Sequence, residues 1–311
     1  MIYPAFFNAK NSLNLFGLEE NLKFLLNLYN KKKLPKVLML TGAKGSGKST
    51  LINHFLFSIF DSDNYNEKNF NLSINSSFLK QFKNDIFSNI IYINGSDFKS
   101  IKIDDIRDLK NKISKSAILN KDRFIILNNI ELFNHNSLNA LLKIIEEPSE
   151  NNYFILINNK SKPLLETVKS RTLEIKIILS EIQRLEIIEN LINLYDLELI
   201  LEPKSSKLTP GDFVKFNHIC NEYKILPAND LIDNITLLLD LYKKNKDILF
   251  INLVFFTINY YFNNLIEKKG FKKEKIYEMR NYIFNNLNNF MVYNINQKSL
   301  LNILDKKLNN E

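Results

Sequence analysis

Short apolar runs alternate with helical apolar spacing along residues 1–178. Uninterrupted runs of four or five apolar residues, bounded by polar or turn residues, are typical of strands buried on both faces of a parallel sheet. We predict such strands at residues 37–40, 90–93 and 153–157, and at 123–127, where the apolar run follows Arg123. Residues 173–177, in which Glu174 and Lys176 alternate with apolar residues, are predicted as a fifth strand that closes the unit. Apolar residues recur every three or four positions between them, which predicts helices at 22–28, 49–60, 105–116, 135–145 and near 164–168. This alternation favours an α/β fold in which helices cover both faces of a parallel sheet.

The pattern changes after residue 178. Ser180 and Gln183 form a capping-box sequence, which predicts a helix over residues 181–195. From the turn Thr209-Pro210-Gly211 onward the spacing is helical, and no strand candidate follows. We therefore predict three parts, an α/β domain over 1–178, a small helical lid over 179–214 and an all-helical domain over 215–311.

The loop after the first predicted strand carries the candidate chemistry. Its sequence, Gly42-Ala43-Lys44-Gly45-Ser46-Gly47-Lys48-Ser49, fits the phosphate-binding pattern G-x-x-x-x-G-K-[ST], and Thr50 follows in the helix. Backbone N–H groups of such a loop hold phosphates at a helix N-terminus. Lys48 is expected to reach the β- and γ-phosphates and the Ser49 hydroxyl to ligate Mg²⁺. We predict that the loop binds ATP or ADP with Mg²⁺.

Composition and charge change this picture only a little. The 42 Lys and Arg residues exceed the 34 Asp and Glu residues, for a net charge of +8, which suits a polyanionic partner such as nucleic acid. The basic residues are nearly all lysines and are spread along the chain. A general enrichment of the sequence in lysine would therefore give the same excess of positive charge without any nucleic-acid partner. One cysteine, Cys220, excludes an internal disulfide and a multi-cysteine zinc site, so we expect no zinc and a reducing cytoplasm.

The longest uncharged run, residues 248–266, is long enough to raise the question of a membrane span. Asn252, Asn259, Asn263 and Glu267 recur there at helical spacing, which indicates an amphipathic helix in a protein core. The N-terminus lacks the charged-then-apolar order of a signal peptide. We expect a cytoplasmic protein without a membrane anchor. The stretch 61–77, rich in Asn, Asp and Ser, predicts an exposed insertion.

Three further stretches carry a resemblance to a known family. They are residues 103–109 (I-D-D-I-R-D-L), residues 138–148 (L-N-A-L-L-K-I-I-E-E-P), and residues 154–159 (F-I-L-I-N-N) continuing to Ser170-Arg171-Thr172. With the phosphate loop they resemble the clamp-loader branch of the AAA+ ATPases, and within it the delta-prime type of subunit. The resemblance extends over about residues 10–180. It implies an AAA+ P-loop domain followed by a helical lid and an all-helical C-terminal collar.

The resemblance also implies partners and site residues. It implies a hetero-oligomer with tau/gamma-like and delta-like subunits, which opens a sliding clamp with ATP and closes it on primed DNA, so that contact with DNA is indirect. The first sensor position falls at Asn158 or Asn159, and we take Asn158 as the residue that would contact the nucleotide together with the loop. Arg171 would act in trans, as an arginine finger on the nucleotide of the neighbouring subunit. Residues 215–311 would form the collar that holds the subunits together.

Several positions depart from a hydrolysing member of the family. Such a member ends its third strand in Asp-Glu, where the Asp orients hydrated Mg²⁺ and the Glu polarises the attacking water. Asn128 and Asn129 stand here instead and supply no charge. Glu131 follows the strand end, and we expect it on the surface. Asp212 lies where the second sensor is usually an arginine, and a carboxylate there opposes the γ-phosphate. We predict weak or absent hydrolysis by this chain itself.

Two other hypotheses remain open. A tau/gamma-type motor subunit would be expected to keep the Asp-Glu pair and the sensor arginine and to have further C-terminal domains. A P-loop kinase of a small metabolite shares residues 42–49, but it leaves the segment 139–148 and the helical C-terminal third unexplained.

Overall fold

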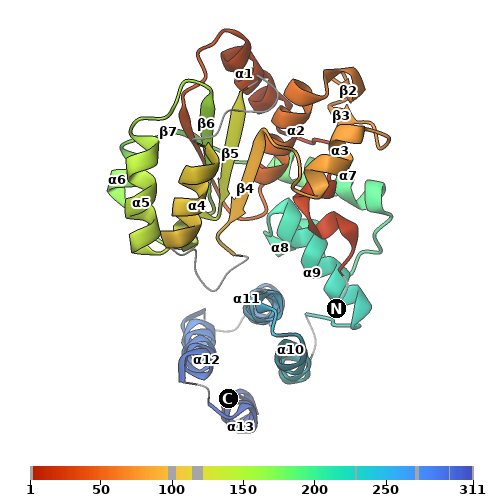
Figure 1. The fold of residues 1–311 in the computed structure, drawn as a ribbon. Helices are drawn as coiled ribbons and strands as arrows, with labels where there is room; N and C mark the ends of the chain where they lie inside the picture. The colour runs from red at the N-terminus through yellow and green to blue at the C-terminus, as the bar shows by residue number, and fades with distance from the viewer. Residues whose placement is uncertain are drawn as a thin grey trace. The chain divides into compact units, whose positions relative to one another are not determined.

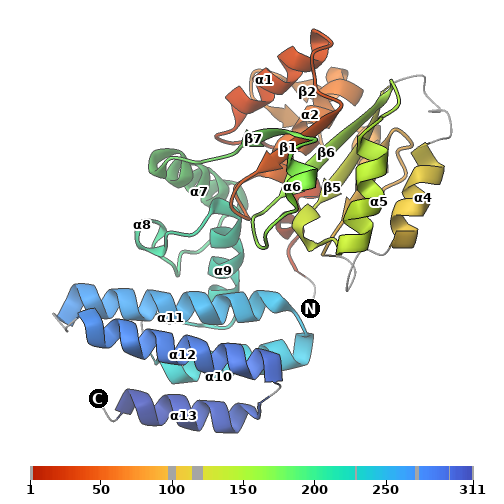
Figure 2. The same cartoon turned by 90° about the vertical axis from the view of Figure 1, so that its left-hand side faces the viewer.

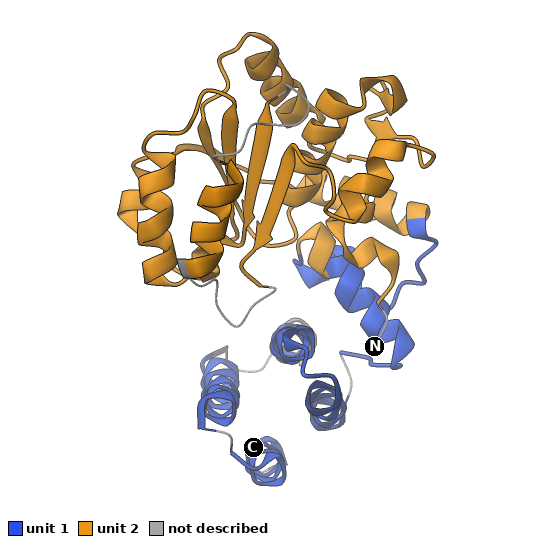
Figure 3. Ribbon diagram, in the orientation of Figure 1, with its two compact units in different colours: residues 1–2, 195–208, 213–311 blue, residues 3–194, 209–212 orange. Residues whose placement is uncertain are grey.

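The chain folds into two units, which Figure 3 colours separately. The computed structural model describes residues 3–96, 103–113, 122–227, 230–269, 273–293 and 295–309. The α/β unit comprises residues 3–194 with 209–212, and the helical unit comprises residues 195–208 with 213–311. The boundary falls inside the predicted lid and assigns its segments to both units. The three-part division into 1–178, 179–214 and 215–311 stays a prediction.

A five-stranded parallel sheet forms the centre of the α/β unit (Figure 1). Its strands are β1 (Val37–Thr41), β4 (Ile90–Asn94), β5 (Arg123–Asn128), β6 (Asn152–Asn158) and β7 (Leu173–Lys176). The strand order is β4-β5-β6-β1-β7, with every neighbouring pair parallel. Each predicted strand is confirmed to within one residue at its ends. The predicted α/β fold, with the glycine-rich loop directly after a central strand, is likewise confirmed.

Alternate residues of β1 separate the two faces of the sheet. Leu38 and Leu40 pack with α1 (Glu19–Asn30), α2 (Lys48–Phe60) and α3 (Ser77–Lys83), whereas Val37 and Met39 pack with the helices of the opposite face. Those helices are α4 (Ile103–Ile113), α5 (His135–Ile145) and α6 (Glu166–Lys169), and Figure 2 shows them on that side of the strands. Because both faces are covered, every residue of β1 is buried, as its uninterrupted apolar run predicts.

Two local predictions were wrong in part. The stretch 61–77 is no plain exposed insertion, because Tyr65 and Leu72 are buried in the core beside α2. They lie on β2 (Tyr65–Asn66) and β3 (Asn71–Leu72), which form a short antiparallel pair. The helix predicted over 105–116 begins two residues earlier, at Ile103, so that Asp104 lies inside its first turn; residues 114–116 lie outside the described residues.

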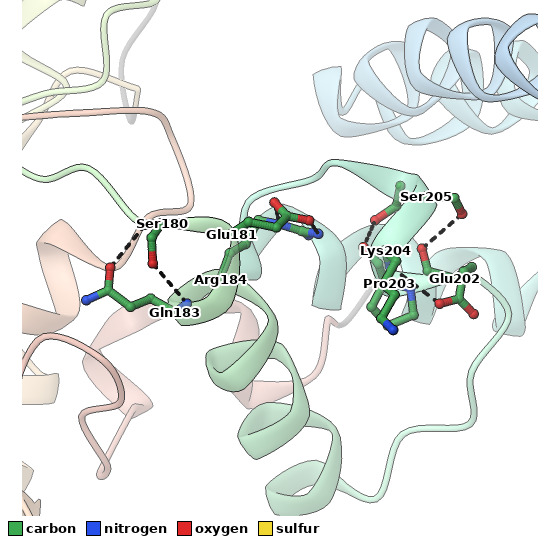
Figure 4. Close-up of polar contacts among 9 residues, drawn as sticks. Ser180, Glu181, Gln183, Arg184, Glu202, Pro203, Lys204 and Ser205 are labelled. Atoms are coloured by element: carbon green, nitrogen blue, oxygen red, sulfur yellow. Dashed lines mark hydrogen bonds and ion pairs between the residues drawn. The ribbon is translucent and has the colours of Figure 1, made fainter.

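The capping box of α7 (Glu181–Tyr195) is confirmed. The Ser180 hydroxyl accepts from the N–H of Gln183 at 3.2 Å, and the Gln183 side chain accepts from the N–H of Ser180 at 3.0 Å (Figure 4). Both donors would otherwise lack partners at the start of the helix. Arg184 lies one turn further on and donates two hydrogen bonds to Glu181, at 3.0 and 2.8 Å. The capping box and the Glu181–Arg184 pair therefore both stabilise the first turn of this helix.

The main helices of the helical unit are α10 (Leu231–Asn245), α11 (Ile248–Lys269), α12 (Lys273–Tyr293) and α13 (Gln297–Asn309). They are preceded by α8 (Pro203–Ser206) and α9 (Pro210–Glu222). The first residues of α9, up to Asp212, belong to the α/β unit. By length and composition alone, residues 248–266 are apolar enough to cross a membrane. Leu253, Ile258 and Phe262 are nevertheless buried inside the unit, while Asn252 and Asn263 are exposed. The helix is therefore amphipathic within this bundle, as its polar stripe predicts.

His54 of α2 joins the N-terminal segment to the α/β core. Its buried ring contacts the Ser12 carbonyl through Nε2 at 3.1 Å and the Tyr65 hydroxyl through Nδ1 at 3.0 Å. Because a carbonyl only accepts, Nε2 carries the proton and Nδ1 accepts from Tyr65. Both bonds suit a neutral imidazole, and burial lowers the pKa of His54 to about 4.

We expect His54 to make the protein acid-sensitive. Its folded pKa lies below the ordinary value of 6.5, so the unfolded chain binds more protons between these two pH values. The stabilisation is therefore complete above pH 6.5 and is lost as the pH falls towards 4, by about 3 kcal/mol in total. Urea unfolding of the wild type and His54→Gln across this range measures it. The same pH dependence in both proteins would contradict the assignment.

Candidate functional site

The phosphate loop connects β1 to α2 through two glycines with positive φ. Gly45 has φ +79° and Gly47 has φ +90°, a region that favours glycine. Gly42 donates its N–H to the carbonyl of Asn158 at 3.2 Å, because β1 and β6 are neighbours and Thr41 pairs with Asn158. The register of the sheet thus fixes the start of the loop against the end of β6. Ala43 and Lys44 are exposed at the top of the loop, and Ser46 is buried.

Lys48 opens α2, one residue earlier than predicted, and lies beneath the loop with 2% of its surface exposed. Its ammonium donates to the carbonyls of Gly42 (2.9 Å) and Ala43 (2.6 Å) and to the Ser46 hydroxyl (3.3 Å). Burial lowers the pKa of Lys48 to about 8, and the negative charges of Glu131 and Asp212 oppose that shift. At neutral pH the ammonium therefore stays largely charged, which is the form that a phosphate oxygen would bind.

The glycine positions of the loop leave no room for a side chain. A Cβ atom at Gly42 would overlap the carbonyl of Ile177, and one at Gly47 would lie 2.8 Å from a Leu18 methyl. Ser49 and Thr50 follow in the first turn of α2 and are half-buried. These residues fit a nucleotide with Mg²⁺, because N–H groups, one ammonium and a hydroxyl lie on one helix N-terminus.

The turn Thr209–Asp212 packs directly on this loop. Gly211 donates its N–H to the carbonyl of Gly45 at 2.9 Å. A Cβ atom at Gly45 would overlap the Thr209 hydroxyl, and one at Gly211 would lie 3.0 Å from the Gly45 Cα. The two glycines thus let two backbones meet. Asp212 brings a carboxylate to the loop, as its position in the sequence predicts.

A chain of amides links the carboxyl ends of β4, β5 and β6. Asn129 donates to the side-chain oxygen of Asn94 at 2.6 Å and accepts from the side-chain nitrogen of Asn159 at 2.6 Å. Asn128 reaches the same Asn94 oxygen at 3.5 Å. The Asn128 side-chain oxygen is buried and accepts no hydrogen bond from the described residues, so it could accept one from water on a metal ion. The sequence analysis did not identify Asn94 as part of the site. Its position at the end of a strand could have indicated it, because neighbouring parallel strands end at the same edge of the sheet.

Glu131 is buried, and the prediction of a surface position was wrong. Its side chain lies in the 3₁₀ turn Ile130–Leu132 and the residue is 5% exposed. The carboxylate accepts from the N–H of Asn159 at 3.2 Å and from the Ser161 hydroxyl at 2.8 Å. The cause is local, because Asn129 adopts a left-handed conformation with φ +53° and turns the chain towards the end of β6. The site thus keeps one buried carboxylate that sequence reasoning placed outside it.

The structure brings Asn158 to the loop but gives Arg171 other contacts. Asn158 is buried, and its side-chain oxygen accepts from the N–H of Lys160 at 2.8 Å. Arg171 follows α6, and within the described part of the chain its contacts are with Glu146, Thr167 and Ser170. Its side chain is 35% exposed and does not join the loop, and its predicted role in trans stays a prediction.

A family model described as "DNA polymerase III, delta subunit" matches residues 17–180. Curated relatives include the DNA polymerase III subunit delta' of Buchnera aphidicola subsp. Baizongia pistaciae, 37% identical over 73 residues (24% of this chain and 22% of the relative). The subunit delta' of Pseudomonas aeruginosa is 38% identical over 76 residues, 24% of this chain and 23% of the relative. The matched part thus spans less than a quarter of either relative.

Other similarities extend further along the chain. The DNA polymerase III subunit gamma of Buchnera aphidicola subsp. Schizaphis graminum is 24% identical over 174 residues, 54% of this chain and 45% of the relative. A solved gamma subunit-related protein of Thermotoga maritima aligns with a TM-score of 0.45 at 19% identity, over 91% of this chain and 99% of that chain.

Replacing Gly45 by alanine tests the contact between the loop and the Thr209–Asp212 turn. A positive φ costs an alanine about 1–2 kcal/mol, and the new Cβ would overlap the Thr209 hydroxyl. We expect Gly45→Ala to lower the free energy of unfolding by about 2 kcal/mol or more, as measured by urea denaturation.

Thr209→Ala separates the two contributions. The Thr209 hydroxyl oxygen is buried without a hydrogen-bond partner in the described ranges, so its loss alone should change stability by less than about 1 kcal/mol. In the Gly45→Ala background, Thr209→Ala should remove the destabilisation that comes from the steric overlap. It should leave the destabilisation that comes from the positive φ of residue 45. Equal destabilisation by Gly45→Ala with and without Thr209→Ala would show that the two residues do not interact.

Proposed function

Because this chain belongs to the family described as DNA polymerase III, delta subunit, we propose that it is a delta-prime-like subunit of the clamp loader. It would assist ATP-dependent loading of the sliding clamp on primed DNA and hydrolyse little ATP itself. One observation carries this proposal, the neutral amide chain beside an intact phosphate loop. Asn128 and Asn129 replace the carboxylates that orient Mg²⁺ and polarise water, and their side chains bond to other amides.

Nucleotide binding would rest on the loop, Gly42 to Thr50, with Asn158 at its side. Lys48 would exchange its bonds to loop carbonyls for bonds to phosphate oxygens, and Ser49 would hold Mg²⁺. The bound ion would neutralise phosphate charge. Neither amide at the strand end can act as a general base, and Glu131 is already hydrogen-bonded by Asn159 and Ser161. This arrangement supports retention of the nucleotide more than its hydrolysis.

Subunit association would involve the helical unit, with tau/gamma-like and delta-like partners in a cytoplasmic hetero-oligomer. Phe250, Val254 and Phe290 of these helices are buried, so they contribute no exposed apolar surface. Other apolar side chains support the proposal instead. Val292 and Tyr293, at the end of α12, are 70% and 73% exposed. The clamp and primed DNA would be reached through the assembled complex.

A gamma/tau-type motor subunit is the second candidate. One observation favours it, since the similarity to the gamma relative spans 54% of this chain and that to the delta' relatives 24%. Asn128, Asn129 and Asp212 weigh against it, because a motor would be expected to have carboxylates at the first two positions and an arginine at the third.

We expect the purified chain to bind ATP or ADP with Mg²⁺ and to turn ATP over far more slowly than about once per second, the lower end of ordinary enzyme rates. Lys48→Ala should abolish binding, as followed with a fluorescent nucleotide. Phosphate release measures turnover. Asn128→Asp with Asn129→Glu restores the carboxylates and is a matched variant, although Asp212 remains. Turnover at ordinary rates, abolished by Lys48→Ala, would favour the motor subunit.

Arg171 would carry this chain's contribution to catalysis on its neighbour. It is one of five arginines in a lysine-rich chain, and its planar fork suits a phosphoryl group better than lysine does. In the assembled complex we expect Arg171→Ala to slow hydrolysis at one neighbouring site by about 10³-fold or more, with clamp and primed DNA present.

Two controls accompany Arg171→Ala, a check that the complex still assembles and a variant that keeps the positive charge. Arg171→Ala should leave nucleotide binding by this chain and complex formation unchanged. Arg171→Lys keeps the charge without the fork and should rescue little. An assembled Arg171→Ala complex that hydrolyses ATP and loads the clamp at the wild-type rate would overturn the finger assignment.

A further inference from the structure

Glu146 contacts Arg171 across 25 residues of sequence. It directly follows α5 and ends that helix with an N–H bond to the Leu142 carbonyl at 3.0 Å. Arg171 lies just beyond α6, and its N–H bonds to the Val168 carbonyl at 3.2 Å. Both helices pack on the same face of the sheet, where Ile145 and Val168 are buried in one cluster. Two fixed backbones therefore present the carboxylate and the guanidinium to each other.

The contact occupies one edge of the guanidinium. Nε and Nη2 of Arg171 approach the same Glu146 oxygen, at 2.7 and 2.6 Å. Nη1 donates to the Thr167 carbonyl at 3.0 Å and reaches the Ser170 hydroxyl at 3.5 Å. A guanidinium has five N–H donors in a plane. Nε and Nη2 face Glu146, and Nη1 faces Thr167 and Ser170. The end-on edge between Nη1 and Nη2 therefore keeps the second N–H of Nη2 for another oxyanion.

Stability gives little reason for this pair. The two side chains are 35% and 45% exposed, and exposed ion pairs contribute little to folding. Their effect on geometry is larger, because arginine has many rotamers and ordering it is unfavourable. A side chain held in advance loses less freedom when it meets a ligand. Glu146 thus orders the guanidinium of Arg171 before any partner binds.

We propose that Glu146 is the positioning residue of Arg171. It holds the guanidinium so that the end-on edge faces the γ-phosphate of a nucleoside triphosphate bound by the neighbouring subunit. This inference rests on the proposed function of Arg171 in trans. Glu146 touches no substrate and acts only through Arg171. Glu147, the next residue, is exposed and takes no part in the contacts of Arg171, so it provides a matched carboxylate for control.

The test uses the full chain in the assembled complex with clamp and primed DNA. Glu146→Ala should lower kcat at the neighbouring site by about tenfold and leave KM within about twofold, because a finger acts mainly in the transition state. Glu146→Gln keeps the accepting oxygen and should recover most of the loss. Glu147→Ala should match the wild type.

The Arg171→Ala background separates positioning from other roles. Glu146→Ala should have no further effect there, since its target is gone. An equal loss in that background, a wild-type kcat for Glu146→Ala, or a matching loss for Glu147→Ala would overturn this inference alone. A wild-type rate for Arg171→Ala would overturn the finger assignment and this inference with it.

Discussion

The pairing of β1 with β6 on one side and β7 on the other determines where the phosphate loop begins. Because β1 is buried on both faces, its chain leaves the sheet only at the carboxyl edge, where the loop must turn at once into α2. All five strands are parallel, so their ends meet at that edge. The amides of β4, β5 and β6 come together there for the same reason, although they lie far apart in sequence.

Negative charge near the phosphate loop is absent from the end of β5 but is supplied by carboxylates from two other segments. The strand-end pair is neutral, yet Glu131 and Asp212 both place negative charge near Lys48 and oppose the effect of its burial. One carboxylate comes from a 3₁₀ turn after β5 and the other from the first turn of α9. Both carboxylates favour the charged form of the lysine against the effect of its burial.

The sequence predicted the sheet, the loop and the capping box because each depends on local spacing. Apolar runs identify strands that are buried on both faces, and Ser180 with Gln183 identifies the start of α7. The failures depend on contacts that spacing does not report. Glu131 is buried by the left-handed turn at Asn129, and Tyr65 is buried through its neighbours in the core. Family resemblance indicated Arg171, but no pattern in the sequence indicated its contact with Glu146.

The amide chain has a consequence for how the site responds to its surroundings. Side-chain amides do not titrate, so Asn94, Asn129 and Asn159 keep the same donors and acceptors at every pH at which the chain is folded. A pair of carboxylates at this edge would change its hydrogen bonds with protonation and would attract a metal ion by its own charge. With amides in their place, a metal ion bound here with a nucleotide would be attracted mainly by the phosphates, and its binding would depend on theirs.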